Sequence, residues 1–278
     1  VVRTLEDIKL SYAGSTDLNT QLNNINFSEE HQQFLNQIEH PIFKEQCRDY
    51  FANTQFRRDL FIRGKNNLTP LQTQQRLSQI PFVLLCNPRD IPKTINGYLG
   101  EFNLIQDIYQ PIGQLFKDKN YQALTIAEMA KQQPQLNYSQ ILNALVILCH
   151  LGLAQPCQLD PTEKMIKQCQ NINLYLLDQA SFQTSYQVLA SAIPGIGIPT
   201  DHFTQLFYRA YFVDALKTAK QLANYVYEVL IGLNLVVLDQ DAKPVQDKAK
   251  SIEIIQAKAQ VFLDSDKIDI AKQLKLFA

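Results

Sequence analysis

Apolar positions in the first hundred residues follow helical spacing and then change to alternation. Residues 26–38 are expected to form a helix, because their apolar side chains share one face and Ser28 is a suitable N-cap. Residues 40–53 repeat the helical pattern, whereas 55–63 alternate as a strand does, although imperfectly. An apolar run at 81–86 predicts another strand. This mixture is typical of an α+β domain.

A polar segment containing Asn96, Gly97 and Gly100 predicts a hairpin, after which the pattern becomes helical. Three consecutive segments have helical periodicity: 104–118, 124–132 and 137–157. Gly152 stands where a left-handed C-terminal cap is wanted. Three helices that close on a short strand and a turn are the order found in a winged helix.

A second copy of this order is expected further along the chain. Segments 137–157 and 217–244 both run from a long apolar helix into a strand and a polar turn, and Gly152 corresponds to Asn234. Closing helices are expected over 251–277. The fold class predicted is α+β and mostly helical. The predicted domains are an N-terminal α+β domain (1–103), a winged-helix domain (104–178) and a C-terminal helical, winged-helix-like domain (179–278).

Charge argues against a nucleic-acid function. The chain has 26 basic and 27 acidic residues, which gives a net charge of -1, and neither sign gathers in one region. Between Lys131 and Lys164, where the recognition helix of a DNA-binding winged helix would lie, there is no Lys or Arg. Because phosphate contacts supply much of the affinity for DNA, a packing or protein-contact role is favoured for the winged helix.

Histidines and cysteines give no sign of a metal site or a disulfide framework. The five cysteines have no CxxC pairing, and the four histidines are well separated. This cysteine usage favours a reduced, cytoplasmic location. No apolar run reaches the roughly 18 residues of a membrane-spanning helix, and the first residues lack the apolar region of a signal peptide.

Two stretches resemble catalytic or cofactor motifs but are better explained structurally. The GxG within 194–199 lacks a third Gly, and the preceding 186–192 looks helical, so a structural turn is expected in place of a nucleotide loop. A triad could be drawn from Ser191, Asp201 and His202, but no GxSxG surrounds the serine. Asp201 is instead expected near the start of a helix.

Arginines at the junction of the 40–53 helix and the following strand need partners. On a strand, Arg57 and Arg63 would share one face, and Arg58 would lie on the apolar face. A buried Arg58 would require a carboxylate, which Glu45 or Asp49 could supply. Arg58 and Arg63 are therefore candidates for a structural clamp or for contact with an anionic substrate.

The same junction resembles the EQ..D[FY]..N..FR..L signature of the methyltransferase regulatory region. This region accompanies the catalytic domain in bacterial class I methyltransferases that use S-adenosylmethionine (SAM), including protein-lysine methyltransferases. The residues that match are Glu45, Gln46, Asp49, Tyr50, Asn53, Phe56, Arg57 and Leu60, and their expected role is structural. Residues 10–17 are similar to the family's passage out of the catalytic domain. Residues 189–199 are similar to its LASP..G.G.P segment, with Ala192 where the family usually has proline.

The resemblance implies a non-catalytic chain, with no catalytic, cofactor-binding or metal-binding residues of its own. SAM is expected in an upstream or partner catalytic domain, because the family's glycine-rich cofactor loop has no counterpart here. The implied partners are that domain and a protein substrate methylated on lysine, without nucleic acid or membrane insertion. The alternatives are a winged-helix DNA-binding transcriptional regulator and a hydrolase that uses Ser191 and His202.

Overall fold

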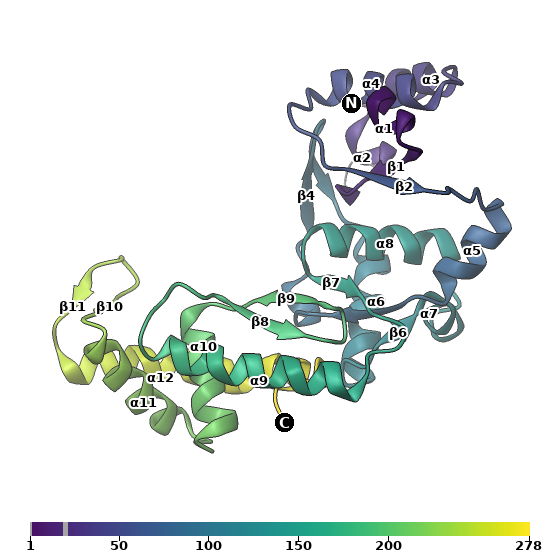
Figure 1. Ribbon diagram of the computed structural model, residues 1–278. Helices are drawn as coiled ribbons and strands as arrows, with labels where there is room; N and C mark the ends of the chain where they lie inside the picture. Colours follow the sequence, from purple (N-terminus) through teal and green to yellow (C-terminus); the bar gives the residue numbers. More distant parts are fainter. Residues whose placement is uncertain (1, 19–21) are drawn as a thin grey trace. The chain divides into compact units, whose positions relative to one another are not determined.

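The computed structural model describes residues 2–18 and 22–278, which fold into two compact units (Figure 1). The first unit combines the segment up to Ile80 with Pro88–Leu115 and Leu124–Gln155, and the second combines Pro81–Asn87, Phe116–Ala123 and Pro156–Ala278. The described chain is about half helical and its small paired strands are antiparallel, which confirms the predicted α+β class.

The first unit holds most of the elements predicted before residue 157. Its helices are α1 (Val2–Asp7), α2 (Asn23–Asn26), α3 (Glu29–Asn36), α4 (Pro41–Ala52), α5 (Pro70–Ser78), η2 (Pro88–Asp90), α6 (Gln106–Asp118, whose last turn belongs to the second unit), α7 (Ile126–Gln132) and α8 (Tyr138–His150). Its strands are β1 (Leu10–Ser15), β2 (Asp59–Arg63), β4 (Thr94–Gly97), β5 (Gly100–Asn103), β6 (Leu124–Thr125) and β7 (Ala154–Pro156, whose last residue belongs to the second unit).

Side-chain caps fix where several of these helices begin. The Ser28 hydroxyl accepts a hydrogen bond from the His31 amide at the start of α3, as predicted. Capping boxes led by Thr125 and Asn137 begin α7 and α8. Gly152 follows α8 with φ 71°, a left-handed conformation that favours glycine and that the sequence predicts at this position.

Two antiparallel ribbons lie in the first unit. Strands β4 and β5 form the predicted hairpin, and β1 pairs with β2 through an irregularity between Tyr12 and Gly14. The strand predicted over 55–63 begins only at Asp59, so the assignment of 55–58 to a strand is wrong. Asn53 adopts a left-handed conformation at the end of α4, which turns the chain away before it can pair.

The core of the first unit is built on α6, α7 and α8. Ile112, Ile126, Met129, Ile141 and Leu148 are completely buried, and each comes from an apolar position of a segment predicted to be helical. A smaller cluster of Phe27, Leu35 and Cys47 joins α3 to α4, with Phe51 packed against it. The smaller cluster holds α4 against α3, which matters because α4 carries the candidate site.

The second unit contains the C-terminal helices and two hairpins. Its elements are β3 (Pro81–Leu84), α9 (Glu163–Ala180), β8 (Val188–Ser191), β9 (Ile196–Pro199), α10 (His202–Tyr208), the π-helix η3 (Arg209–Val213), α11 (Ala219–Gly232), β10 (Val237–Leu238), β11 (Pro244–Val245), α12 (Lys248–Asp264) and α13 (Lys267–Gln273). The helix, strand and turn predicted over 217–244 are present, as are the closing helices.

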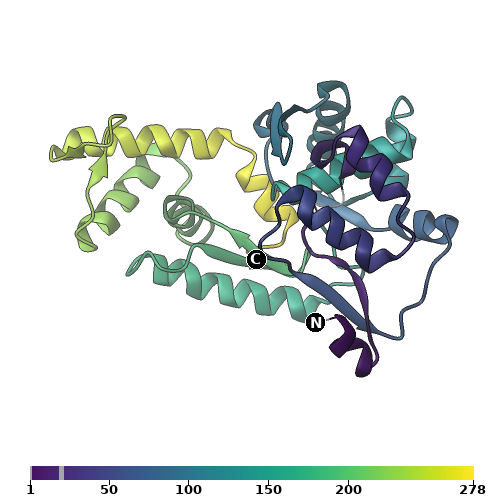
Figure 2. The same ribbon diagram turned by 90° about the horizontal axis from the view of Figure 1, so that it is seen from above.

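The prediction that residues 186–192 are helical is wrong, because they contain strand β8. Asn173 of α9 supplies the physical reason: its amide donates to the Ala190 carbonyl (2.8 Å) and accepts from the Ala190 N–H (2.6 Å), as a neighbouring strand would. The chain then turns at Gly195, with φ 68°, into β9. Figure 2 shows α9 alongside this hairpin. The predicted turn is therefore a hairpin turn.

The second unit is also held by a polar cluster around Asp266. Its carboxylate accepts hydrogen bonds from Asn87 Nδ2 and Tyr121 Oη, and it lies 2.9 Å from Lys117 Nζ. Burial and the Asp266 hydrogen bond raise the pKa of Tyr121 above its ordinary value. The cluster therefore ties the two early segments of this unit to its C-terminal helices.

Candidate functional site

Helix α4 presents the carboxylates of the candidate site. The helix begins at Pro41, where the His40 ring nitrogen Nδ1 accepts from the Phe43 amide. Glu45 and Asp49 are four residues apart and thus share one face. The left-handed Asn53 ends the helix and sends the chain back past this face.

Arg57 is the hub of the site. Its Nη1 lies 2.8 Å from Asp49 Oδ2, its Nε donates to Asp59 Oδ1 at 3.0 Å, and its Nη2 lies 3.1 Å from Glu45 Oε2. Nη2 also donates to the Tyr12 hydroxyl at 2.7 Å, and this hydroxyl in turn donates to Glu45. One guanidinium therefore joins α4, β1 and the start of β2.

Burial and neighbouring charges shift the pKa values of two groups in the hub. Burial alone would lower the pKa of Arg57, but hydrogen bonds to Asp49 and Asp59 outweigh it, and the net pKa lies above the ordinary arginine value. Burial, followed by the negative charge of Glu45, raises the pKa of Tyr12 to about 12. The hub therefore keeps its arginine charged and its tyrosine neutral at physiological pH.

Arg48 forms the inner wall beside this hub. Its guanidinium lies 4.8 Å from the ring centroid of Phe27, and Nη1 donates to Asn23 Oδ1 at 2.6 Å. Its Nε is 3.5 Å from Glu45 Oε1. The residue is only 8% exposed, so it connects the α4 face to the small apolar cluster beneath it.

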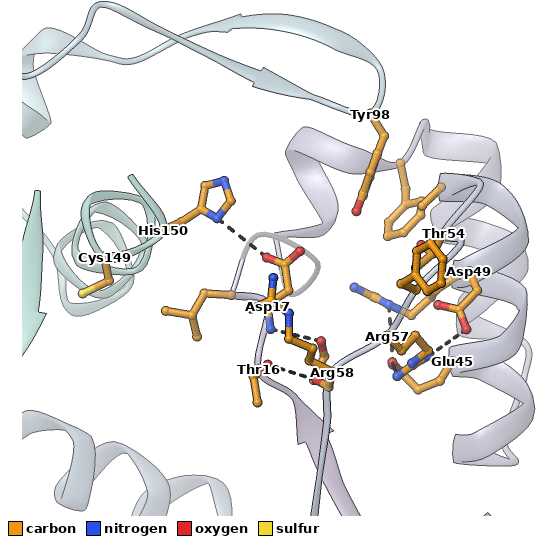
Figure 3. A pocket seen from close by; sticks show the side chains of 16 residues that line it. Thr16, Asp17, Glu45, Asp49, Thr54, Arg57, Arg58, Tyr98, Cys149 and His150 are labelled. Carbon is orange, nitrogen blue, oxygen red and sulfur yellow. Dashed lines mark hydrogen bonds and ion pairs between the residues drawn. The ribbon is translucent and has the colours of Figure 1, made fainter. Parts of the chain in front are cut away.

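A cavity of about 400 Å³ opens beside the hub, entirely within the first unit (Figure 3). Its walls come from residues 15–18, the inner face of α4, residues 54–58, the tip of the β4–β5 hairpin and the end of α8. This volume lies in the range of small-ligand pockets, and both charged and aromatic side chains line it.

The end of α8 contributes residues that the sequence analysis did not assign to a site. His150 Nδ1 lies 3.6 Å from Asp17 Oδ1 across the cavity, as Figure 3 shows. Cys149 also lines the cavity, but burial raises the pKa of its thiol to about 12, so the thiol is protonated and a poor nucleophile. No local pattern could have found this contact, because α8 is far from residue 17 in sequence.

The two arginines predicted as a clamp or substrate contact lie outside the hub. Arg58 is exposed, and its carbonyl accepts from both the amide and the hydroxyl of Thr16. Arg63 Nη2 donates to the Ile8 carbonyl at 3.2 Å. The clamp with Glu45 is thus made by Arg57, because residues 55–58 are not a strand and their side chains do not alternate as predicted.

The family-signature residues divide into two sets. Glu45, Asp49 and Arg57 form the half-buried ion-pair hub. The others are exposed: Gln46, Asn53, Tyr50 (74%), Phe56 (92%) and Leu60 (52%). Contacts within the described chain therefore account for the three charged residues of the signature and for Asn53, which ends α4, and they leave Tyr50, Phe56 and Leu60 on the surface.

The residues of the triad alternative are engaged with the main chain. Ser191 Oγ donates to the Leu274 carbonyl at 2.8 Å, and His202 Nε2 lies 2.7 Å from the Ala180 carbonyl oxygen. Asp201 is the N-cap of α10, as its predicted position implies. Burial acts to raise the pKa of Asp201, but hydrogen bonds from Thr204 and the charge of Lys267 bring the net pKa below its usual value. All three thus have structural contacts.

The described part of the chain contains no group of three or more His, Cys, Asp or Glu side chains arranged to hold a metal ion. Among its helices, none combines the length and apolarity that crossing a bilayer requires.

Comparison with known proteins confirms the class that the signature indicates. Residues 1–63, which include every signature residue, match the family described as "Predicted methyltransferase regulatory domain". The resemblance inferred from the signature is therefore correct for this region.

Individual relatives extend the likeness along the whole chain. An uncharacterized protein of Synechocystis, sll1526, is 28% identical over 99% of this chain and 53% of its own length. PKMT2 from Rickettsia typhi, solved in complex with AdoHcy, has the same fold over 99% of this chain and 56% of its own, with a TM-score of 0.57 and 13% identity. A second structure of that protein gives a TM-score of 0.54 and 16% identity. The chain spans about half the length of these relatives.

Proposed function

We propose that this chain is the non-catalytic regulatory and substrate-recognition region of a SAM-dependent methyltransferase. It docks on a class I catalytic domain and positions a protein substrate for methylation on lysine. The SAM site lies in that catalytic domain, whether the domain is joined to this chain or is a separate partner. The cytoplasm is the expected location.

The observation that carries this proposal is the fold shared with PKMT2 along 99% of the chain. The match of residues 1–63 to the methyltransferase regulatory family supports it independently. AdoHcy is bound by the longer PKMT2, of which this chain corresponds to 56%. These lengths are consistent with catalysis in the part of PKMT2 that this chain does not cover and with substrate recognition in the part that it does cover.

The proposal keeps the three domains expected from the sequence. Residues 1–103 form the regulatory α+β part that carries the hub, 104–178 a winged helix and 179–278 a second winged-helix-like module. Both winged helices serve as packing and protein-contact modules. Neither the family match nor the structural neighbours favour the DNA-binding alternative, and the net charge of -1 provides no attraction for DNA.

A methyl-transfer assay tests this function. A matching class I methyltransferase domain, mixed with this chain, should transfer more radiolabelled methyl groups from SAM to protein lysines in a heat-treated cell extract than the domain does alone. Serum albumin in place of this chain is the control. Equal transfer with the chain and with albumin would contradict the proposal.

Calorimetry tests where the cofactor binds. SAM titrated into the isolated chain should give no binding heat, because the proposal places the cofactor site in the catalytic domain. Micromolar binding of SAM to the chain alone would show that this assignment is wrong.

A further inference from the structure

The cavity beside the hub has more hydrogen-bond donors than its own residues use. The guanidinium of Arg57 donates hydrogen bonds to Tyr12 and to three carboxylates. In turn, Glu45 and Asp49 form ion pairs with Arg57. Asp17 Oδ1 lies 3.6 Å from His150 Nδ1. A cationic ligand would therefore have to displace Arg57 before it could reach Glu45 or Asp49.

Arg58 provides the cation that these pairs leave available. Within residues 2–18 and 22–278, no carboxylate lies at ion-pair distance from its guanidinium. Its main chain is nevertheless held firmly, because the Thr16 amide (2.8 Å) and hydroxyl (3.1 Å) both donate to the Arg58 carbonyl. The side chain thus extends from a fixed base at the wall of the cavity.

Tyr98 adds a donor from the other side of the cavity, as Figure 3 shows. Its amide donates to Asn26 Oδ1 at 3.3 Å, which holds the hairpin tip against α2. A side chain at Gly97 would meet the Ile25 carbonyl at 2.7 Å, so glycine allows this close approach. Thr54 lines the same cavity and brings a hydroxyl group to its wall.

The cavity also has an apolar rim suited to a polypeptide. Phe56 is 92% exposed although it lies next to the hub in sequence, and Leu18 is 39% exposed. Both line the cavity. An extended peptide could place one acidic side chain against Arg58 and a neighbouring apolar side chain against Phe56, whereas a free anion would use only the polar part.

We propose that this cavity binds the carboxylate of a glutamate or aspartate in a protein segment, with the Arg58 guanidinium as the main contact and the Tyr98 and Thr54 hydroxyls as additional donors. The proposal rests on the proposed function, because it makes the cavity the place where the regulatory region recognises acidic sequence in its protein substrate. Charge-assisted hydrogen bonds to arginine are strong enough to select carboxylate over amide.

Fluorescence anisotropy tests the proposal directly. A short labelled peptide with a central Glu next to Phe should bind the chain at least about tenfold more tightly than the same peptide with Gln, since one charge-assisted contact is lost. Inorganic phosphate should compete for the Arg58 contact, and added salt should weaken binding. Equal affinity for the Glu and Gln peptides would overturn the proposal.

Variants of the chain locate the binding site. Arg58→Gln should lower affinity for the Glu peptide about tenfold and abolish the preference over Gln, and Tyr98→Phe should lower it by a smaller factor. Arg63→Gln is the matched control, because Arg63 is bound to the Ile8 carbonyl and does not line the cavity. A loss of affinity in Arg63→Gln equal to that in Arg58→Gln would indicate non-specific attraction and overturn the proposal.

The two proposals fail separately. If the chain stimulates methyl transfer but the Glu and Gln peptides bind equally, the cavity assignment is wrong and the proposed function stands. If Arg58-dependent peptide binding is found without any stimulation of methyl transfer, the carboxylate site stands and the link to methylation is wrong.

Discussion

At the scale of single residues, Arg57 decides how the N-terminal part of the chain is held together. Three carboxylates and the Tyr12 hydroxyl converge on it, and two of the carboxylates come from one face of α4. Such a cluster is stable only while the arginine is present, because the carboxylates would otherwise repel one another in a half-buried setting.

Arg57→Met should therefore lower the free energy of unfolding by about 2–3 kcal/mol, a value reduced from that of a fully buried pair because the side chain is 24% exposed. Urea denaturation followed by circular dichroism measures the change, since the chain has no Trp to report by fluorescence. The control Arg58→Met should stay within about 0.5 kcal/mol of the wild type. An equal loss of unfolding free energy in the two variants would contradict the stabilising role assigned to Arg57.

The sequence was sufficient to find the partners of this hub but not the correct arginine. Glu45 and Asp49 follow from the helical spacing of α4, which was predicted correctly. The choice between Arg57 and Arg58 depended on strand alternation at residues that do not form a strand. The contact between His150 and Asp17 could not be predicted from the sequence, because it depends on tertiary packing between distant segments.

At the scale of elements, the sequence predicts helices and turns correctly where residues close in sequence fix their ends. Ser28, the hairpin at 94–103 and Gly152 were all predicted from local chemistry. Strand β8 was missed because its pairing partner includes the side chain of Asn173, which sequence periodicity cannot reveal. That asparagine is completely buried, and it also donates to the Leu276 carbonyl at 2.8 Å.

Asn173→Leu should destabilise the second unit by about 2–4 kcal/mol, because the Ala190 amide and carbonyl and the Leu276 carbonyl would be buried without partners. Protection of the β8 amides against hydrogen exchange should fall accordingly. Asn171→Leu is the control on the same helix, since Asn171 is exposed. Unchanged β8 protection in Asn173→Leu would argue against this role.

At the scale of the whole molecule, neither compact unit is a single stretch of chain. Residues 81–87 and 116–123 belong to the second unit, although they are embedded in sequence that builds the first. The Asp266 cluster shows what holds them there, because its donors Asn87, Lys117 and Tyr121 come from these two segments. A boundary drawn along the sequence therefore cannot separate the units cleanly.

Asp266→Asn should consequently raise hydrogen exchange in residues 81–87 and 116–123 as well as in α13, while α4 and β1 keep their protection. The carboxylate holds all three donors, and an amide would lose the Lys117 ion pair and one acceptor. Mass spectrometry of exchanged peptides measures the pattern. Asp264→Asn is the matched control, because the exposed Asp264 binds only Gln260 of its own helix among the described residues. Exchange that rises equally in both units would contradict the assignment.

The same cluster sets an order of events during protein synthesis. Asn87, Tyr121 and Lys117 leave the ribosome long before Asp266, from which they are separated by 179, 145 and 149 positions. Until Asp266 emerges, the two early segments have no carboxylate to close upon, and joining ends so far apart carries the entropic cost of a long loop. The cluster can therefore close only late in synthesis, after most of the second unit has emerged.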